Sequence, residues 1–263
     1  MWAKSMEFEC QHLSKAYQTR NSVVPALEDV TFSVREQEFV CIVGPSGCGK
    51  TTLLKLIAGL LQPTSGRIVF GAGRANDRPQ SALVFQEHGL FPWMTVLDNV
   101  AFGLEMRGVA REERRRRAQA FVERVGLAHF AESLPHELSV GMRQRAGIAR
   151  AFVADTPVLL MDEPFGSLDA QIRRVLQQEL LRLWKEHRKL VIYVTHDIEE
   201  AVLLGDRVLV MTGRPSSIRE EISIPLSRPR GLSTRAQPEA KEIRRHIWKL
   251  LGDEVKRSLW ISG

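Results

Sequence analysis

Residues 44–51 are the part of the chain whose types and spacing fit the binding of a polyphosphate. They read Gly44-Pro45-Ser46-Gly47-Cys48-Gly49-Lys50-Thr51 and match G-x-x-x-x-G-K-[ST] at every required position. A glycine-rich backbone can curl tightly enough to point successive N–H groups inward, and a helix starting near Lys50 adds the positive end of its dipole. We expect Lys50 to reach the β- and γ-phosphates and the Thr51 hydroxyl to take one Mg²⁺ position. For Cys48, a passive filler of a variable position is a simpler interpretation than a redox switch.

The elements that must position this loop are short apolar runs. They lie at residues 39–43, 81–85, 158–161 and 190–195. Continuous apolar runs of this length predict strands that are buried on both faces, which is typical of a parallel sheet covered by helices. Ligands bind such sheets at the carboxyl ends of the strands. We therefore expect one site assembled from the residues that follow all four runs.

Polar residues follow the other three runs. After its run, Asp162 can hold Mg²⁺ through water, and Glu163 is placed to take a proton from an attacking water. His196 can hydrogen-bond a γ-phosphate or order the water, and Gln86 can contact the metal or the water. Adjacent acids can also form a solvated turn, and a lone histidine is more often structural. The catalytic interpretation therefore depends on the neighbouring glycine-rich loop.

The rest of the chain predicts helices. Arg111–Gly126 is a charged helix with a left-handed C-cap at Gly126, and a second helix follows Ser139, within a helical insertion between core strands. From about Pro225 the chain becomes polar and basic, as in a linker. An amphipathic helix follows, with apolar residues 243, 247, 250, 251 and 255. Packing against the core and a dimer or regulatory contact are both open for its apolar face.

Composition sets the class of protein. The 263 residues carry 37 basic and 31 acidic side chains, a net charge of +6, with 44% hydrophobic residues. This composition excludes collagen-like and wholly disordered chains. We expect no membrane span and no secretory signal, because the apolar runs are short and interrupted. Three widely spaced cysteines suit a reducing compartment. The expectation is a soluble, basic, intracellular α/β protein.

Taken in order, these motifs resemble the nucleotide-binding ATPase subunit of ABC transporters, from about residue 8 to residue 224. The resemblance rests on Tyr17, the glycine-rich loop, Gln86, Leu138-Ser139-Val140-Gly141-Met142, Asp162-Glu163, Ser167-Leu168-Asp169 and His196. It implies a P-loop NTPase core with a mainly parallel sheet, an N-terminal antiparallel β subdomain and an inserted α-helical subdomain. The implied boundaries are residues 1–225 for the ATPase domain, about 88–154 for the helical insertion, and 226–263 for a short basic linker and C-terminal helix.

The resemblance also implies roles for the matching residues. The implied ATP contacts are Tyr17, Gly44, Pro45, Ser46, Gly47, Cys48, Gly49, Lys50, Thr51, Thr52, Ser139, Gly141 and Asp169. The implied catalytic residues are Glu163, His196, Lys50 and Gln86, and the implied Mg²⁺ ligands are Thr51, Gln86 and Asp162. In the family the residue at the position of Tyr17 stacks on adenine; an ordinary strand-edge tyrosine is the alternative.

One position departs from the family's signature sequence, Leu-Ser-Gly-Gly-(Gln/Met). Val140 stands where the family has glycine. A β-branched residue resists positive φ, so we expect a backbone conformation there that valine tolerates. Weaker ATP-driven closure is one consequence that this departure allows.

The resemblance implies that ATP closes a homodimer, with each ATP held between the loop of one subunit and Ser139 of the other. The implied partners are integral-membrane permease subunits and a periplasmic or lipoprotein solute-binding protein, which places the chain peripherally on the cytoplasmic face of the inner membrane. Phe91-Pro92-Trp93 looks like part of the permease docking cleft, although packing within the insertion is the alternative. Residues 91–104 and Thr212-Gly213-Arg214-Pro215 particularly resemble importers of nitrate, sulfonates and taurine.

Two other kinds of ATPase share the catalytic residues. One serves an export or lipid-transfer complex and differs only in its partner. The other acts on nucleic acid, and Arg114–Arg117 is the basic run that could touch phosphate. Four consecutive arginines on a helix point in all directions, however, so they do not form one basic face. The repair ATPases that this family resemblance includes insert a long coiled coil between the glycine-rich loop and the signature sequence. Here the roughly 90 residues between Lys50 and Ser139 contain no sustained heptads. We therefore expect no direct contact with nucleic acid.

Overall fold

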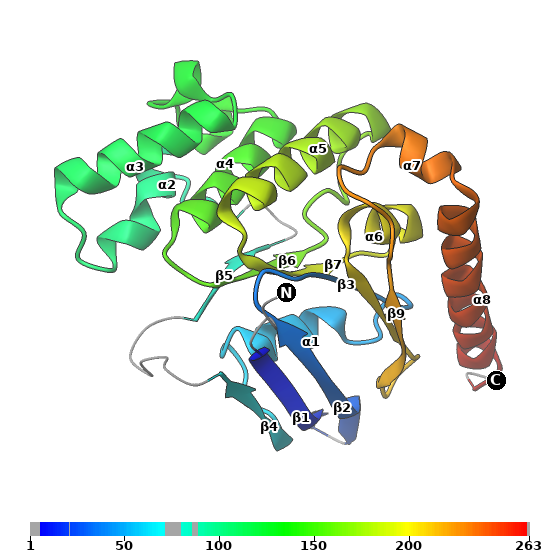
Figure 1. The fold of residues 1–263 in the computed structure, drawn as a ribbon. Helices are drawn as coiled ribbons and strands as arrows, with labels where there is room; N and C mark the ends of the chain where they lie inside the picture. Colours follow the sequence, from blue (N-terminus) through cyan, green and yellow to red (C-terminus); the bar gives the residue numbers. More distant parts are fainter. Residues whose placement is uncertain (1–5, 21, 72–79, 86–88, 262–263) are drawn as a thin grey trace. The chain divides into compact units, whose positions relative to one another are not determined.

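The computed structural model of the chain describes residues 6–20, 22–71, 80–85 and 89–261. The chain forms two compact units. The first contains Met1–Arg78 and Lys189–Gly263, and the second contains Pro79–Arg188. Figure 1 shows both units and labels most of their helices and strands. The segment after residue 225, which the sequence predicts to be a linker and a helix, belongs to the first unit.

The first unit begins with an antiparallel sheet. Strand β1 (Met6–Gln18) pairs with β2 (Val23–Arg35) on one side and with β4 (Ser65–Phe70) on the other. Buried and exposed residues alternate in the second half of β2, as expected for a strand with one face on a core. Phe8 is fully buried, and its ring centroid lies 6.3 Å from that of Phe32. This sheet confirms the predicted N-terminal antiparallel β subdomain.

Parallel strands form the second layer of the first unit. Strand β3 (Phe39–Val43) lies between β7 (Leu190–Val194) and β8 (Arg207–Met211) and runs parallel to both. Strand β9 (Ile218–Ser223) adds to β8 in the antiparallel direction. Every residue of β3 and β7 is buried, which explains their continuous apolar runs. The register pairs Ile42 with Val194, so the segments that follow β3 and β7 start at the same edge of the sheet.

The helices of the first unit are α1 (Lys50–Ile57), α6 (Ile198–Leu204), α7 (Leu232–Ala236) and α8 (Pro238–Ile261). The C-terminal helix α8 contacts α6 and β8. Ala240 and Ile247 are buried in these contacts, and the carboxylate of Glu254 accepts hydrogen bonds from Arg219 at 2.6 Å and from the Gly213 N–H at 2.9 Å. The structure therefore agrees with packing of the apolar face of α8 against the core.

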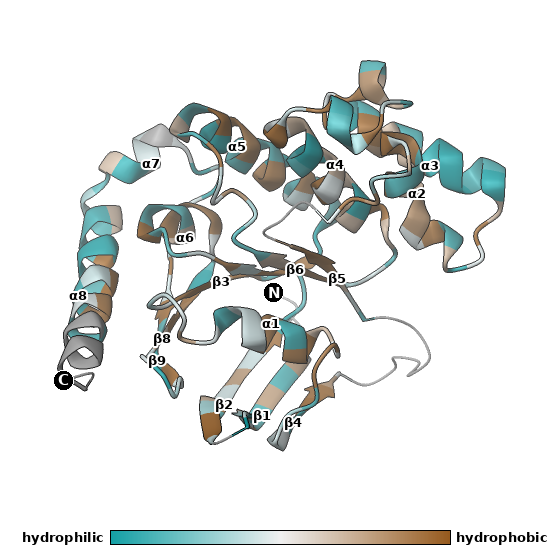
Figure 2. Cartoon of the chain, turned by 180° about the vertical axis from the view of Figure 1, so that it is seen from behind, coloured by the Kyte–Doolittle hydropathy of each residue, from teal (hydrophilic) through white to brown (hydrophobic). Residues whose placement is uncertain are grey.

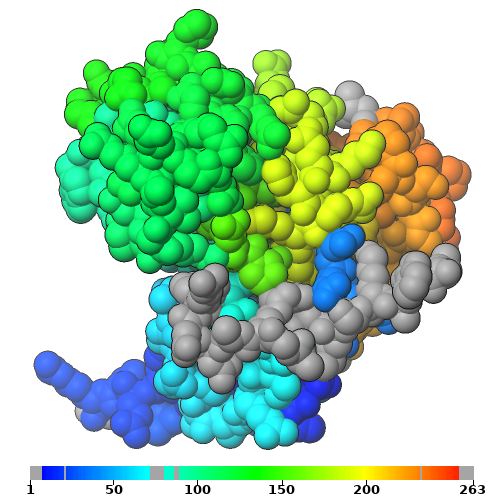
Figure 3. All heavy atoms as spheres, turned by 60° about the vertical axis from the view of Figure 1, so that its left-hand side comes forward, coloured from blue at the N-terminus to red at the C-terminus, as the bar shows by residue number. Residues whose placement is uncertain are grey.

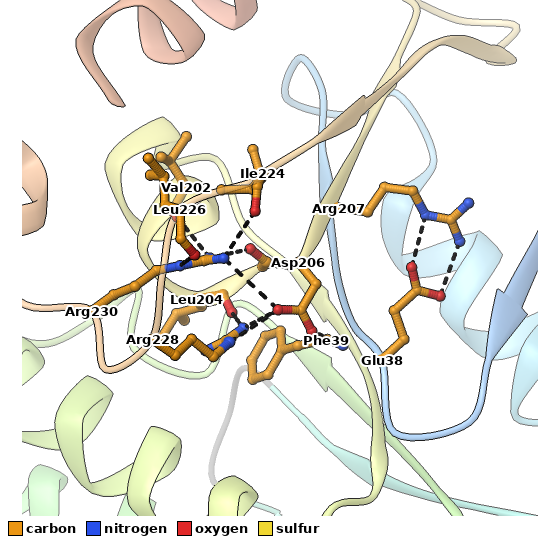
Figure 4. Close-up of polar contacts among 11 residues, drawn as sticks. Glu38, Phe39, Val202, Leu204, Asp206, Arg207, Ile224, Leu226, Arg228 and Arg230 are labelled. Carbon is orange, nitrogen blue, oxygen red and sulfur yellow. Dashed lines mark hydrogen bonds and ion pairs between the residues drawn. The ribbon is translucent and has the colours of Figure 1, made fainter. Parts of the chain in front are cut away.

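Two arginines of the segment after residue 225 form hydrogen bonds that hold its start against the core of the first unit (Figure 4). We call Arg228, Arg230 and Asp206 the arginine clamp. Arg228 donates from Nε and Nη2 to Asp206 Oδ1, at 3.0 and 2.7 Å, and the other oxygen of Asp206 accepts from the Phe39 N–H at 3.0 Å. Arg230 is buried, its Nη2 lies 3.8 Å from Asp206 Oδ1, and its guanidinium donates hydrogen bonds to four backbone carbonyls. These belong to Val202, Gly205, Ile224 and Leu226.

The second unit joins two parallel strands to a helical layer. Strand β5 (Ser81–Val84) pairs with β6 (Val158–Asp162), with Val84 opposite Met161. The helices are α2 (Val96–Glu105), α3 (Arg111–Arg124), α4 (Val140–Val153) and α5 (Ala170–His187). Helix α2 packs on α3 and α4, and α4 packs on β5 and α5. Gly126 has φ +70°, which matches the predicted left-handed end of the charged helix.

Helix α3 is the most polar of these helices (Figure 2). Figure 3 shows the surface of this part of the sequence in green. Each arginine in the basic run of α3 pairs with a carboxylate. Arg114 pairs with Glu105, Arg115 with Asp98 and Glu132, Arg116 with Glu113, and Arg117 with Asp155. In the described part of the chain, no helix combines the length and the apolar character that a membrane crossing needs.

Candidate nucleotide-binding site

The glycine-rich loop connects β3 to α1 and is tightly curled. Gly47 has φ +73° and Gly49 has φ +113°, conformations that residues with a side chain rarely adopt. A Cβ atom at Gly49 would lie 3.0 Å from Leu27 Cδ2 and 3.2 Å from the Ala26 carbonyl oxygen. Space around Gly49 therefore suffices only for hydrogen, which accounts for glycine at this position.

Lys50 is the first residue of α1 and points back into the loop. It is 6% exposed, and its Nζ donates to the carbonyl oxygens of Gly44 at 2.9 Å and Pro45 at 3.0 Å. Gly49, the N-cap of α1, supplies no side-chain hydrogen bond to the first turn. Such a helix start carries N–H groups that no residue within the helix can satisfy, and these groups attract anions. The loop thus offers a buried ammonium group and a helix N-terminus to one anionic ligand.

Tyr17 of β1 lies beside the same helix. Its hydroxyl is 3.2 Å from Thr52 Oγ1, and Lys15 Nζ lies 5.6 Å from the centre of its ring. The first unit therefore brings Tyr17 next to the residues that follow the loop. Stacking of this ring on adenine stays a prediction.

His196 follows β7 at the sheet edge where the loop follows β3. The N–H of Thr195, the preceding residue, donates to the Ile42 carbonyl oxygen at 3.1 Å. Asp197, the next residue, caps α6: its Oδ1 accepts from the N–H groups of Glu199 and Glu200 at 2.8 and 3.2 Å. The side chain of His196 is exposed between these two anchored residues. The predicted proximity of His196 to the loop edge thus follows from the strand register.

In the second unit, Asp162 and Glu163 end strand β6. Asp162 is 7% exposed, and Glu163 has φ +43°, a conformation that is uncommon for residues other than glycine. The Gly166 N–H donates to the Glu163 carbonyl oxygen at 3.1 Å and closes a tight turn. Residues held in such conformations cluster at functional sites. The strain at Glu163 is compatible with the proposed catalytic carboxylate, and spacing alone did not predict it.

Ser139, Val140 and Gly141 begin helix α4. Ser139 is the N-cap and accepts from the Met142 N–H at 3.3 Å. Val140 is the first residue of the helix and does not have a positive φ, so its backbone adopts a conformation that valine tolerates, as expected. Its side chain is exposed, at 38%. A Cβ atom at Gly141 would lie 3.3 Å from Ile172 Cγ2, so glycine allows α4 to approach α5.

Asp169 caps α5, the helix that Gly141 approaches. Its Oδ1 accepts from the N–H groups of Gln171 and Ile172, at 2.9 and 3.0 Å. The second unit therefore brings the starts of α4 and α5 together. Gln86, predicted to contact Mg²⁺ or water, lies outside the described residues.

The aromatic residues of the insertion separate into a packed one and an exposed one. The ring of Phe91 lies 4.6 Å from that of Phe102, and the Arg150 guanidinium lies 5.7 Å from its centre. Trp93 is 71% exposed, although its ring lies 5.7 Å from Phe91. Phe91 thus packs within the insertion, Trp93 presents an exposed aromatic surface, and docking of a permease at this pair stays a prediction.

Sequence reasoning missed two sets of buried polar residues. Asn99 is fully buried in α2 and bonds the backbone of Phe91, Met94 and Thr95, which fixes the loop that carries Trp93. Thr195 and Glu200 are buried behind His196. An amide next to the apolar positions 96, 97, 100 and 101 of this helix was the available signal for Asn99. A glutamate followed by the apolar run 201–204 was the signal for Glu200.

Comparison with known proteins supplies the family. A family model described as ABC transporter matches residues 27–166. The chain is 44% identical over 222 residues to the nitrate import ATP-binding protein NrtD of Synechocystis, covering 84% of each chain. It is 47% identical over 221 residues to the taurine import ATP-binding protein TauB of Burkholderia thailandensis, covering 83% of this chain and 85% of that one.

A solved structure shares the fold. It is a dimeric ATP-binding cassette in a post-hydrolysis state with ADP and Pi, with a TM-score of 0.71 and 32% sequence identity. The alignment covers 84% of this chain and all of the other. These matches confirm the predicted P-loop ATPase fold. The chain therefore belongs to the ABC transporter family, as an ATP-binding subunit that hydrolyses ATP.

Proposed function

We propose that the chain powers an importer of nitrate, a sulfonate, taurine or a related small solute. The observation that carries the ATP-driven part is the loop, which curls through the left-handed residues Gly47 and Gly49 and whose Gly44 and Pro45 carbonyls hold the Lys50 ammonium group. The names of the nitrate and taurine import relatives support the importer part. The solute itself is bound by other subunits in this proposal.

In the proposed reaction the loop and Lys50 bind the phosphates of ATP, and Tyr17 stacks on the adenine. Thr51 and Asp162 offer hydroxyl and carboxylate oxygens, which are the ligands that Mg²⁺ prefers, and Gln86 is a third proposed contact. When bound, the metal ion neutralises charge on the phosphates.

Proton transfer in this reaction is assigned to Glu163. Its carboxylate accepts a proton from the water that attacks the γ-phosphorus, while His196 donates a hydrogen bond to a γ-phosphate oxygen. The turn at Glu163 supports this assignment, because a strained backbone conformation fixes the direction in which the side chain leaves β6.

Two copies of the chain form the proposed working unit. Ser139 and Gly141 of one copy contact the ATP held by the loop of the other, and Asp169 contributes to the same interface. The starts of α4 and α5, which carry these residues, lie together in the second unit. The dimeric state of the related cassette with ADP and Pi supports this proposal.

The proposed partners are permease subunits in the membrane and a solute-binding protein, periplasmic or lipid-anchored. We propose that the permease docks near Phe91 and Trp93, since Trp93 is exposed on a loop that Asn99 holds in place. The chain would then sit peripherally on the cytoplasmic face of the inner membrane.

Reconstitution tests this proposal against its rivals. With the permease and binding protein in proteoliposomes, solute should stimulate ATP hydrolysis, and Lys50→Ala should lower the stimulated rate at least about 100-fold. Lys241→Ala, an exposed lysine on α8, is the matched control and should leave the rate unchanged. Stimulation without solute import would favour an exporter. Salt-sensitive retention on DNA would favour a nucleic-acid ATPase, which the paired arginines of α3 do not support.

A further inference from the structure

A buried carboxylate lies directly behind the proposed catalytic histidine. Glu200, in the first turn of α6, is 4% exposed, and Thr195 is 2% exposed. The Thr195 hydroxyl donates to Glu200 Oε2 at 2.5 Å. A carboxylate is rarely buried to this extent unless it is paired or hydrogen-bonded. One partner of this carboxylate is Thr195, the residue that immediately precedes His196.

Thr195 is held from three directions. Its N–H donates to the Ile42 carbonyl oxygen of β3, its hydroxyl donates to Glu200, and its Oγ1 accepts from the Asp197 N–H at 3.0 Å. The residues on both sides of His196, Thr195 and Asp197, are therefore anchored.

The charge of Glu200 also acts on its surroundings. The pKa of the Tyr193 phenol is raised by burial first and then by the negative charge of Glu200, and the pKa of the Cys41 thiol is raised in the same way. The carboxylate of Glu200 therefore lies close to Tyr193 of β7 and Cys41 of β3 as well as to Thr195.

We propose that Glu200 is a positioning residue for ATP hydrolysis: it holds the Thr195 hydroxyl, and through it the turn that presents His196 at the loop edge. The inference rests on the proposed role of His196. Alternatively, the same hydrogen bonds only complete the start of α6. The two alternatives differ in whether loss of the Thr195 hydroxyl lowers kcat through a changed position of His196.

The test compares two variants of the full chain with Mg²⁺ and ATP. Thr195→Val keeps the shape and removes the hydroxyl, whereas Thr195→Ser keeps it. We expect Thr195→Val to lower kcat roughly 10- to 100-fold, since small misplacements of catalytic groups have effects of this size. The KM for ATP should stay within about twofold, and Thr195→Ser should restore kcat to within about threefold. If Thr195→Val does not fold, Glu200→Leu against Glu200→Gln makes the same comparison, because glutamine retains an acceptor.

A double-variant cycle with His196→Ala separates this inference from the proposed function. In the His196→Ala background, Thr195→Val should cause no further loss of kcat. If the losses of kcat caused by Thr195→Val and His196→Ala instead multiply in the double variant, the role of the Thr195 hydroxyl is merely structural and the proposal is overturned. A wild-type rate for Thr195→Val with an inactive His196→Ala would overturn the positioning role alone. A wild-type rate for His196→Ala would overturn both assignments.

Discussion

Single residues with unusual backbone conformations occur in each of the two units. Gly47 and Gly49 have positive φ in the loop, and Glu163 has positive φ at the end of β6. Such a conformation costs a glutamate roughly 1–3 kcal/mol. The glycines remove that cost in the loop, whereas Glu163 retains it. The carboxylate is therefore held by the turn rather than by an intrinsic preference of the residue.

The two loop glycines should respond differently to alanine. A Cβ atom at Gly47 meets nothing within 4 Å, whereas one at Gly49 meets Leu27 and the Ala26 carbonyl oxygen. Gly47→Ala should lower the free energy of unfolding by about 1–2 kcal/mol, through backbone strain alone. Gly49→Ala should lower it by at least about 2 kcal/mol more, because the clash adds to the strain. Urea denaturation measures both, and equal losses would contradict the crowding at Gly49.

At the scale of elements, helix α6 is held at both ends. Asp197 caps its start, and the arginine clamp satisfies carbonyl groups near its end. Burial is the main cause of the lowered pKa of Arg230, about 10, which still leaves the guanidinium charged at neutral pH. A buried charge that donates to several carbonyls is stabilising only while its partners remain in place.

Removing that charge should therefore destabilise the first unit. Arg230→Met keeps much of the apolar volume but leaves several buried carbonyl groups without their donor, and should lower the free energy of unfolding by roughly 2–4 kcal/mol. Arg245 of α8 is the matched control. Its side chain is 82% exposed, so Arg245→Met should change stability by less than about 0.5 kcal/mol. Thermal unfolding followed by circular dichroism compares the two, and similar losses would show that the clamp is dispensable.

The burial of Arg230 in the arginine clamp could not be predicted from the sequence pattern. Polar and basic residues after Pro225 are typical of a linker, and nothing in their spacing distinguishes a solvated arginine from a buried one. Arg230 is buried where carbonyl groups from two stretches, 202–205 and 224–226, converge on its guanidinium, and that convergence is a property of the tertiary fold. The amphipathic helix after it was predictable, because its apolar positions repeat at helical spacing.

For the whole molecule, the fold class followed from the sequence because buried parallel strands leave continuous apolar runs. The runs at β3, β6 and β7 were each predicted to within a residue or two. The loop was predictable because its motif encodes the backbone conformation directly. The hydrogen bond between Thr195 and Glu200, next to His196, could not be predicted, because it depends on the turn between β7 and α6.

Stability at alkaline pH tests the buried core as a whole. Burial is the main cause of the raised pKa values of Cys10, Cys41 and Tyr193, while the unfolded thiols ionise near their ordinary value of 9.0. The folded state then binds more protons than the unfolded state, so stability is fully present below about pH 8 and falls as the pH rises. Between pH 8 and pH 10 the two thiols and the phenol together should lower the free energy of unfolding by about 3 kcal/mol.

A double variant isolates this effect. Cys10→Ala with Cys41→Ala removes both thiols, and most of the alkaline loss should disappear whatever the stability of the variant at pH 8. Chemical denaturation at a series of pH values provides the measurement. An unchanged slope in the double variant would show that the thiols are not protected by burial.

The proposed role of Glu163 as the base in an ATP-closed dimer is tested by the variant Glu163→Gln. The amide keeps the shape of the side chain but cannot accept a proton, so ATP should bind and remain intact. We predict that the variant hydrolyses ATP at least about 100-fold more slowly than the wild type. With ATP it should elute as a dimer in size-exclusion chromatography with light scattering, and with ADP as a monomer. Turnover at the wild-type rate, or a monomer in saturating ATP, would contradict the account.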